Sequence, residues 1–179
     1  LARAKTTKET INAIMYQIGH YFEPVHWAVL LKASKTENYT FSVVAGRYTN
    51  ELQGKVLPKN KGVAGWIVQH KRPLIMTDSD KDHNFLKYPF EDNFKVRSAI
   101  AAPILINNSI FGIVELVNKI DKNNFTQLDL QILTAIAEYA AISIEKIHYN
   151  QKQIMTKLSL FDSLTGLRNR RHMEMLLAR

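Results

Sequence analysis

The sequence of 179 residues contains no cysteine. This absence excludes disulfides, thiolate metal sites, iron–sulfur clusters, a catalytic thiol and a chromophore attached through a thioether. Proteins without disulfides are typical of the reducing cytoplasm. We therefore expect a cytoplasmic protein.

Long apolar runs are also absent. The longest, such as residues 98–106, are the length of a strand and fall short of the ~18 residues that a membrane-spanning helix needs. The first twenty residues include Arg3, Lys5 and Lys8 and have no continuous apolar core, so we identify no signal peptide. The chain begins with Leu1, which indicates an excised piece of a longer protein. We expect no membrane partner for this piece.

The charge is unbalanced, with 24 Lys and Arg against 16 Asp and Glu and a formal net charge of +8. The basic residues are scattered, apart from Arg168, Arg170 and Arg171 near the end, and the aromatic residues do not lie between them. This pattern favours a solvated basic surface over a nucleic-acid interface. We therefore expect no nucleic-acid partner.

Residue patterns for catalysis and metal binding are missing as well. There is no Ser–His–Asp arrangement, Walker loop or zinc-ligand spacing. Asp78, Asp80 and Asp82 alternate as in a calcium loop, but the required glycine and distal glutamate are absent. The candidate haem ligands are His26, His70 and His83, and none of them has a second ligand at a meaningful spacing. We expect no metal and no certain cofactor.

The first two-thirds of the chain alternates helical and strand-like segments. Ile11, Ile14 and Ile18 give one apolar helical face that Pro24 should end. The stretches 26–32 and 38–45 are rich in aromatic and β-branched residues and predict strands. A short helix is expected after Gly62, and a hairpin is expected from the runs 97–106 and 110–119 around Asn107.

The last element is predicted to be one long helix. No Gly or Pro occurs from Thr126 to Phe161, a length of roughly 54 Å as a helix. Thr126 and Asp129 have the spacing of a capping box. Because a compact domain of this size is only ~30 Å across, we expect the first half to pack on the domain and the second half to leave it.

A heptad repeat along this helix predicts a parallel homodimer. Steps of three and four residues connect apolar positions without a break, and Gln151 is a polar exception that would weaken the pairing. The predicted dimer seam consists of Ala140, Ile144, Ile147, Gln151, Ile154 and Leu158.

Two stretches together resemble the GAF domain family. They are "KGVAGWIVQHKRPLIMTDSDKDHNF" and "RSAIAAPILINNSIFGIVELVNK", and the matching positions are Gly62, Gly65, Pro73, Asp78, Pro103 and Gly112. The resemblance implies an α+β fold with a six-stranded antiparallel sheet flanked by helices, followed by a long C-terminal signalling helix. We divide the chain into an N-terminal helix (1–24), a GAF domain (25–148, its last helix starting near 126) and a coiled-coil linker (149–161).

Residues 162–179 resemble the opening of GGDEF, or diguanylate cyclase, domains. The pattern D-x-L-T-G-L-x-N-R-R of that family is matched by Asp162, Leu164, Thr165, Gly166, Leu167, Asn169, Arg170 and Arg171. The family's active-site loop lies further downstream and is absent, so this chain is not an enzyme by itself. The resemblance implies a bacterial parent that makes cyclic di-GMP from GTP under control of the dimeric helix. The alternative is a ligand-free dimerisation or scaffold module.

The GAF resemblance also implies a ligand pocket. By the geometry of that family its lining would be Trp27, Phe41, Val43, Trp66, Asp78, Phe85, Ser98, Ala99, Ala101 and Glu115. Nucleotide-binding GAF domains of phosphodiesterases carry an N-K…F-x-x-x-D-E pattern, of which Asn118, Lys119, Phe125 and Asp129 are present and the last position is Leu130. We expect Lys119 to pair with Asp129 as a structural tie. The ligand stays open between a cyclic nucleotide, another small molecule and none.

Overall fold

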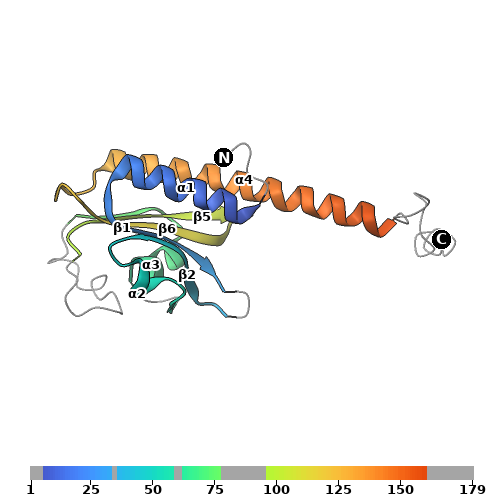
Figure 1. Cartoon of the computed structure of the whole chain (residues 1–179), viewed down its shortest axis with the longest axis horizontal. Coiled ribbons are helices and arrows are strands. Elements are labelled where there is room, and N and C mark those ends of the chain that lie inside the picture. Colours follow the sequence, from blue (N-terminus) through green and yellow to red (C-terminus); the bar gives the residue numbers. More distant parts are fainter. Residues whose placement is uncertain (1–5, 34–35, 59–61, 78–95, 161–179) are drawn as a thin grey trace.

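The computed structural model of the chain describes residues 6–33, 36–58, 62–77 and 96–160 (Figure 1). The residues that resemble the start of a GGDEF domain lie outside this described part, as do Asp78 and Phe85 of the predicted pocket. The elements, in chain order, are α1 (Thr7–Phe22), β1 (Pro24–Lys32), β2 (Tyr39–Gly46), α2 (Thr49–Leu52), β3 (Val56–Leu57), α3 (Gly62–His70), β4 (Leu74–Met76), β5 (Ala99–Ile106), β6 (Ser109–Lys119) and α4 (Gln127–Leu160).

The strands form one six-stranded sheet in the order β3-β2-β1-β6-β5-β4, and every neighbouring pair is antiparallel. This confirms the predicted fold class. The hairpin of β5 and β6 turns through Asn107 and Asn108, whose φ angles are 50° and 59°. Because Ile106 pairs with Ser109, the loop is the two-residue kind that requires positive φ at both positions.

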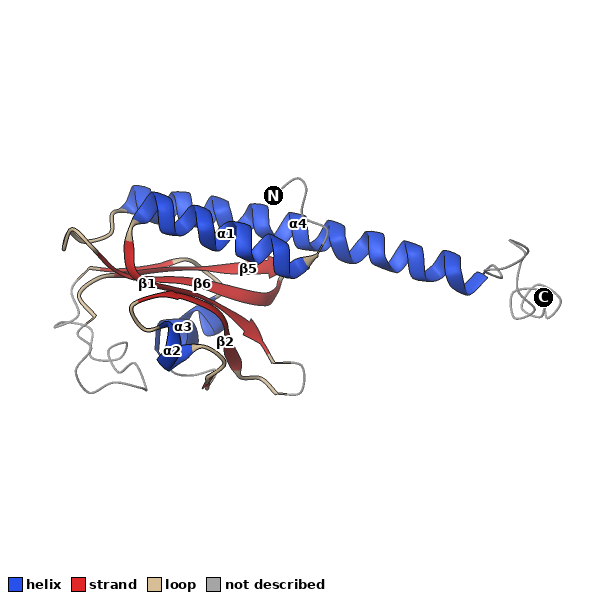
Figure 2. Ribbon diagram, viewed as in Figure 1, coloured by secondary structure: helices blue, strands red, loops and turns tan. Residues whose placement is uncertain are grey.

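Helices cover both faces of the sheet (Figure 2). On one face α1 and α4 lie side by side, antiparallel, and Ile14, Ile18, Leu133 and Ile144 are fully buried between them and the strands. We call this side the α1/α4 face. On the other side, the α3 face, α2 and α3 cover a second core formed with residues such as Leu30, Phe41, Ile67 and Ile113. The sheet therefore separates two apolar cores.

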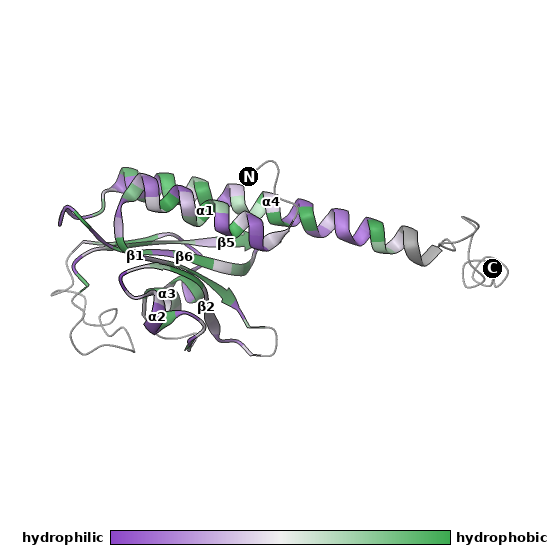
Figure 3. Cartoon of the chain, viewed as in Figure 1, coloured by the Kyte–Doolittle hydropathy of each residue, from purple (hydrophilic) through white to green (hydrophobic). Residues whose placement is uncertain are grey.

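Helix α4 behaves differently along its length. It has 34 residues, and its second half extends beyond the sheet (Figure 1). Apolar residues recur along the half that lies over the sheet (Figure 3), whereas residues 148–156 are all exposed. The predicted division of this helix is therefore present.

The first half of the predicted dimer seam is wrong. Ala140 and Ile144 are 0% exposed and Ile147 is 8% exposed, because these side chains pack on the chain's own sheet and α1. The three- and four-residue spacing that forms a coiled-coil seam is the same spacing that buries one helical face on a sheet. Gln151 and Ile154 are exposed, while the side chain of Leu158 lies outside the described part.

Among the described residues, no helix is long and apolar enough to cross a membrane. The same part of the chain holds no group of three His, Cys, Asp or Glu side chains that could bind a metal ion.

Candidate functional site

Five of the predicted pocket residues lie on the α3 face of the sheet. Phe41, Ala99 and Ala101 belong to the core on this side, and Trp66 of α3 packs against it. Glu115 of β6 pairs with Ala101 across the sheet and therefore points to the same face. Phe41 and Glu115 are only 1% and 2% exposed.

Three other predicted pocket residues lie on the opposite face, so their assignment to the pocket is wrong. Trp27 packs against the α1/α4 core, and its Nε1 donates a hydrogen bond to the carbonyl of Met15 in α1 at 3.1 Å. Val43 packs against the same core because a β-bulge interrupts the pairing of β1 with β2. Leu30 pairs with Phe41 but Val29 pairs with Val43, so the extra residue puts Phe41 and Val43 on different faces.

Ser98 is the third misassigned residue. Its hydroxyl accepts a hydrogen bond of 2.8 Å from the backbone N–H of Phe125, which belongs to the α1/α4 core. Successive side chains in a strand point to opposite faces. Ser98 and the adjacent Ala99 therefore could not both line one pocket.

His26 is a buried polar residue on the α3 face that our pocket prediction omitted. It is 0% exposed, two residues before Ala28 on the same face of β1, and its ring meets that of Tyr48 edge to face at 5.9 Å. Burial lowers the pKa of His26 to about 4, although a backbone hydrogen bond with Ala45 acts in the opposite direction. The imidazole is therefore neutral at pH 7. The alternation of the strand "HWAVLLK" was the signal that could have identified it.

The aromatic ring of Trp66 is partly exposed at the edge of the same face. It stacks on the imidazole of His70 with ring centroids 4.1 Å apart and an interplanar angle of 19°. His70 Nδ1 is 2.9 Å from the carbonyl oxygen of Trp66, which holds the two rings one helical turn apart. Together with His26 and Glu115, this gives an apolar face with a few polar groups, the composition typical of small-molecule sites.

The N-K…F-x-x-x-D residues form a junction between β6 and α4. Lys119 Nζ lies 2.9 Å from Asp129 Oδ2, which also accepts hydrogen bonds from the backbone N–H of Thr126 at 2.7 Å and its hydroxyl at 2.9 Å. The Thr126 hydroxyl accepts in return from the Asp129 N–H at 3.2 Å, completing the predicted capping box. Phe125 is buried, 5.4 Å below the Lys119 ammonium.

The junction also fixes the ionisation of Asp129. Burial raises the pKa of this carboxyl, but the hydrogen bonds from Thr126 and Lys119 outweigh it and the net pKa is lowered. The carboxylate is therefore charged at neutral pH, beside the N-terminal end of α4, where a negative charge is favourable.

Asn118 connects the same junction to β5. It adopts a left-handed backbone with φ of 52°, and its Oδ1 accepts hydrogen bonds from the N–H groups of Arg97 at 2.8 Å and Ser98 at 3.1 Å. All four residues of the motif thus bond to the protein itself, which makes them a structural tie between strands β5 and β6 and the start of α4.

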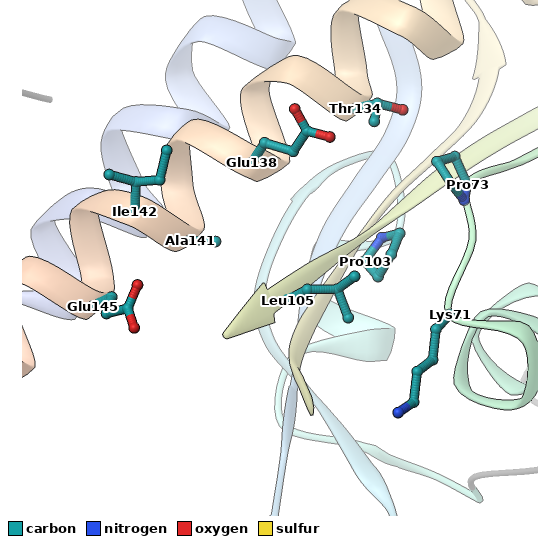
Figure 4. A pocket seen from close by; sticks show the side chains of 9 residues that line it. All are labelled: Lys71, Pro73, Pro103, Leu105, Thr134, Glu138, Ala141, Ile142 and Glu145. Atoms are coloured by element: carbon teal, nitrogen blue, oxygen red, sulfur yellow. The ribbon is translucent and has the colours of Figure 1, made fainter. Parts of the chain in front are cut away.

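A pocket of about 480 Å³ lies beside α4, on the α1/α4 side of the sheet edge (Figure 4). Its floor is apolar, and the carboxylates of Glu138 and Glu145 line it from α4, with Lys71 on the opposite side (Figure 4). Lys71 Nζ donates to the carbonyl of Asn108 at 2.9 Å. None of the predicted pocket residues line this cavity. The remaining lining residues are Pro73, Pro103, Leu105, Thr134, Ala141 and Ile142.

Comparison with known proteins gives one family. A family model described as "GAF domain" matches residues 6–144. The solved second GAF domain of DevS from Mycobacterium smegmatis has a TM-score of 0.68 at 16% identity, over 82% of this chain and 99% of that one.

Curated relatives are similar over a shorter stretch. The bovine cone cGMP-specific 3',5'-cyclic phosphodiesterase subunit alpha' is 23% identical over 96 residues, 53% of this chain and 11% of the relative. The mouse rod cGMP-specific phosphodiesterase subunit alpha is 27% identical over 96 residues, 52% of this chain and 11% of the relative. The chain thus spans about a tenth of the length of these relatives.

Proposed function

We propose that this chain, which belongs to the GAF domain family of sensory and regulatory domains, is the input unit of a diguanylate cyclase and controls the synthesis of cyclic di-GMP from GTP through α4. The observation that carries the proposal is the course of this helix. It begins at a capped junction on the sheet, crosses the α1/α4 core and continues past the domain. Its described part extends to Leu160, and the GGDEF-like pattern of the sequence begins two residues later, at Asp162.

The mechanism follows from how α4 is held at its start. The Lys119–Asp129 pair and the hydrogen bonds of Thr126 fix the first turn, so the direction of every later side chain is set by a rotation of about 100° per residue. A change at the sheet would be transmitted as a shift or rotation of a rigid helix, one of the known forms of switching transition. Two cyclase domains carried by a dimer would then change their relative orientation.

The sensed ligand would bind on the α3 face. The apolar face with His26, Glu115 and Trp66 supports a small and partly planar molecule. A cyclic nucleotide is the first class to test because two relatives are phosphodiesterase subunits named for cGMP. The phosphodiesterase-like motif does not add to this case, since Asn118, Lys119 and Asp129 bond within the protein.

Control by α4 can be tested in the full-length parent by insertions that rotate the second half of the helix about its axis relative to the first half. Two alanines inserted between Asn150 and Gln151, both exposed, rotate all later residues by about 200°, whereas seven inserted residues preserve the heptad phase. We expect the two-residue insertion to change cyclic di-GMP synthesis at least fivefold and the seven-residue insertion to leave it within twofold. Equal synthesis by both variants and the wild type would contradict the proposal.

A second candidate function is a dimerisation or scaffold module without ligand. The near-complete burial of Phe41, Ala99 and Ala101 favours it, because these side chains serve as core whether or not a ligand binds. Native mass spectrometry of the freshly purified chain separates the two functions. A reproducible small-molecule adduct that survives in wild type and is lost in Trp66→Ala supports sensing, and its absence in the presence of cGMP, cAMP and cell extract supports the scaffold.

A further inference from the structure

The outer side of α4, away from the sheet, carries a second row of apolar side chains. Leu128, Ile142 and Tyr149 are each 62% exposed, and Tyr139 is 47% exposed. Exposed apolar residues that occur singly are ordinary on a protein surface. These four lie on one helix, 11, 3 and 7 residues apart, and each of these separations is a sum of the three- and four-residue steps that keep side chains on one side of a helix.

We call this row the outer stripe. Steps of four and three residues connect its seven positions, which are Leu128, Ile132, Ala135, Tyr139, Ile142, Lys146 and Tyr149. Six of them are apolar, and the spacing is the heptad repeat of a helix that pairs with a second helix. Ile132 lies at the margin of the stripe, because it is half-buried and also packs against the α1/α4 core. Lys146, which is exposed, is the single charged position, and one polar residue in such a seam sets register and favours a defined oligomer.

The other apolar row, on the projecting half of α4, points in a different direction. Ile142 of the outer stripe and Ile154 of the predicted seam are twelve residues apart, which places them about 120° apart around a straight helix. Ile154 continues the face that carries Ile144 and Ile147, and these two are buried against the sheet. A single straight partner helix therefore cannot cover both rows.

The sheet decides between the two rows. A parallel partner packed on the Ile154 side would lie roughly 8–10 Å from the α4 axis. Along the first half of α4 that space is filled by β5 and β6, whose residues Ile104 and Leu116 are 0% exposed in the α1/α4 core. A partner helix on the outer stripe does not contact the sheet of the first protomer, because α4 of that protomer lies between the partner helix and the sheet.

We infer that a second copy of this chain binds along the outer stripe, so that the homodimer forms in parallel through Leu128, Tyr139, Ile142 and Tyr149 and not through the Ile144–Ile154 side. The parallel direction rests on the proposed function, which needs both outputs at the same end. Each of these side chains can remove on the order of 100 Å² from water, and with its neighbours the stripe approaches the ~800 Å² per partner of a stable interface. The Ile154 side then becomes available only where α4 bends or leaves its own sheet.

The first experiment compares two matched substitutions by sedimentation equilibrium of the 179-residue chain. Ile142→Asp and Ile154→Asp both place a carboxylate at an exposed isoleucine, 62% and 58% exposed, so neither disturbs the folded monomer. We expect Ile142→Asp to raise the dimer dissociation constant at least about a hundredfold and Ile154→Asp to change it less than threefold. A monomeric wild type, or dissociation by Ile154→Asp alone, overturns the inference.

The second experiment uses the absence of native cysteine, which removes any background of disulfides. Ile142→Cys should cross-link to a covalent dimer under mild oxidation, because paired residues in such a seam approach each other closely. Glu145→Cys, exposed on the same helix but about 80° from the centre of the stripe, should not. Cross-linking of the Glu145 variant alone, or of neither, overturns the parallel arrangement.

These outcomes separate the interface from the proposed function. If Ile142→Asp dissociates the dimer but the two-residue insertion leaves cyclic di-GMP synthesis unchanged, only the proposed function fails. If the insertion changes synthesis while Ile142→Asp remains dimeric, only the outer-stripe interface fails.

Discussion

Removing the Asp129 carboxylate should destabilise the fold through the start of α4. Asp129 Oδ2 has three donors, and the side chains of Lys119 and Asp129 are 19% and 12% exposed. Asp129→Ala therefore leaves the mostly buried ammonium of Lys119 without its carboxylate partner and removes a helix cap. A lost cap costs about 1 kcal/mol, and the unpaired charge costs about 1–2 kcal/mol, below the full value for a deeply buried pair.

We expect Asp129→Ala to lower the free energy of unfolding by about 2–3 kcal/mol at pH 7, measured by urea denaturation, with a fall in Tm of roughly 5–10 °C. Asp129→Asn keeps an acceptor for the cap and should lose about half as much. Glu138→Gln, an exposed carboxylate on the same helix, is the control and should change stability by no more than about 0.5 kcal/mol.

The pH dependence gives an independent check with a defined sign. Because the folded pKa of Asp129 is lowered, its contribution is fully present above its ordinary value of 3.8 and is lost as the pH falls through the folded pKa. The difference between wild type and Asp129→Asn should therefore shrink between pH 5 and pH 2. A wild-type stability equal to that of Asp129→Ala at pH 7, or a difference that does not vary with pH, would refute the reasoning.

Three further predictions concern the sheet. Gly46→Ala should lower the free energy of unfolding by at least about 2–3 kcal/mol in urea denaturation, because φ is +90° and a Cβ would lie 2.3 Å from the Val25 carbonyl oxygen. The control Gly54→Ala, at φ +80° with nothing within 4 Å, should lower it by only about 1 kcal/mol. Equal losses would show that the contact with Val25 is unimportant. The pKa of His26 is lowered from 6.5 to about 4 by folding, so protonation of this imidazole opposes folding. The free energy of unfolding should therefore fall by about 3 kcal/mol as the pH is lowered from 6.5 to 4, and His26→Phe should flatten that part of the stability–pH profile. Trp27→Phe should cost about 1 kcal/mol in thermal unfolding through loss of its hydrogen bond to α1, and an unchanged Tm would argue against that bond.

Local spacing predicted the junction correctly. The three-residue step from Thr126 to Asp129 determines a capping box by itself, and Lys119 at the end of the preceding strand reaches the first turn of the helix. The same holds for the hairpin, where two asparagines supply the positive φ that a two-residue loop needs. Features that depend on a few adjacent residues can therefore be predicted from the sequence alone.

The faces of the sheet could not be predicted in the same way. Strict alternation places Phe41 and Val43 together, and only the pairing of β2 with β1 introduces the bulge that separates them. The outer stripe could not be distinguished in the sequence for a related reason. Both rows of α4 have heptad spacing, and the sequence does not say which one the sheet covers until the tertiary structure buries Ala140 and Ile144.

The bulge in β2 also changes how small insertions and deletions in this family member should be interpreted. Loss of Ser42 would remove the unpaired residue of the bulge, so that Phe41 and Val43 would follow each other in regular alternation on the faces they already occupy and would keep their pairing with Leu30 and Val29. Gly46 would keep its partner His26 and its close approach to the backbone of Val25. A one-residue deletion at Ser42 would therefore straighten the strand without moving a side chain to the other face, whereas a one-residue deletion at a paired position of β2 would invert a strand end.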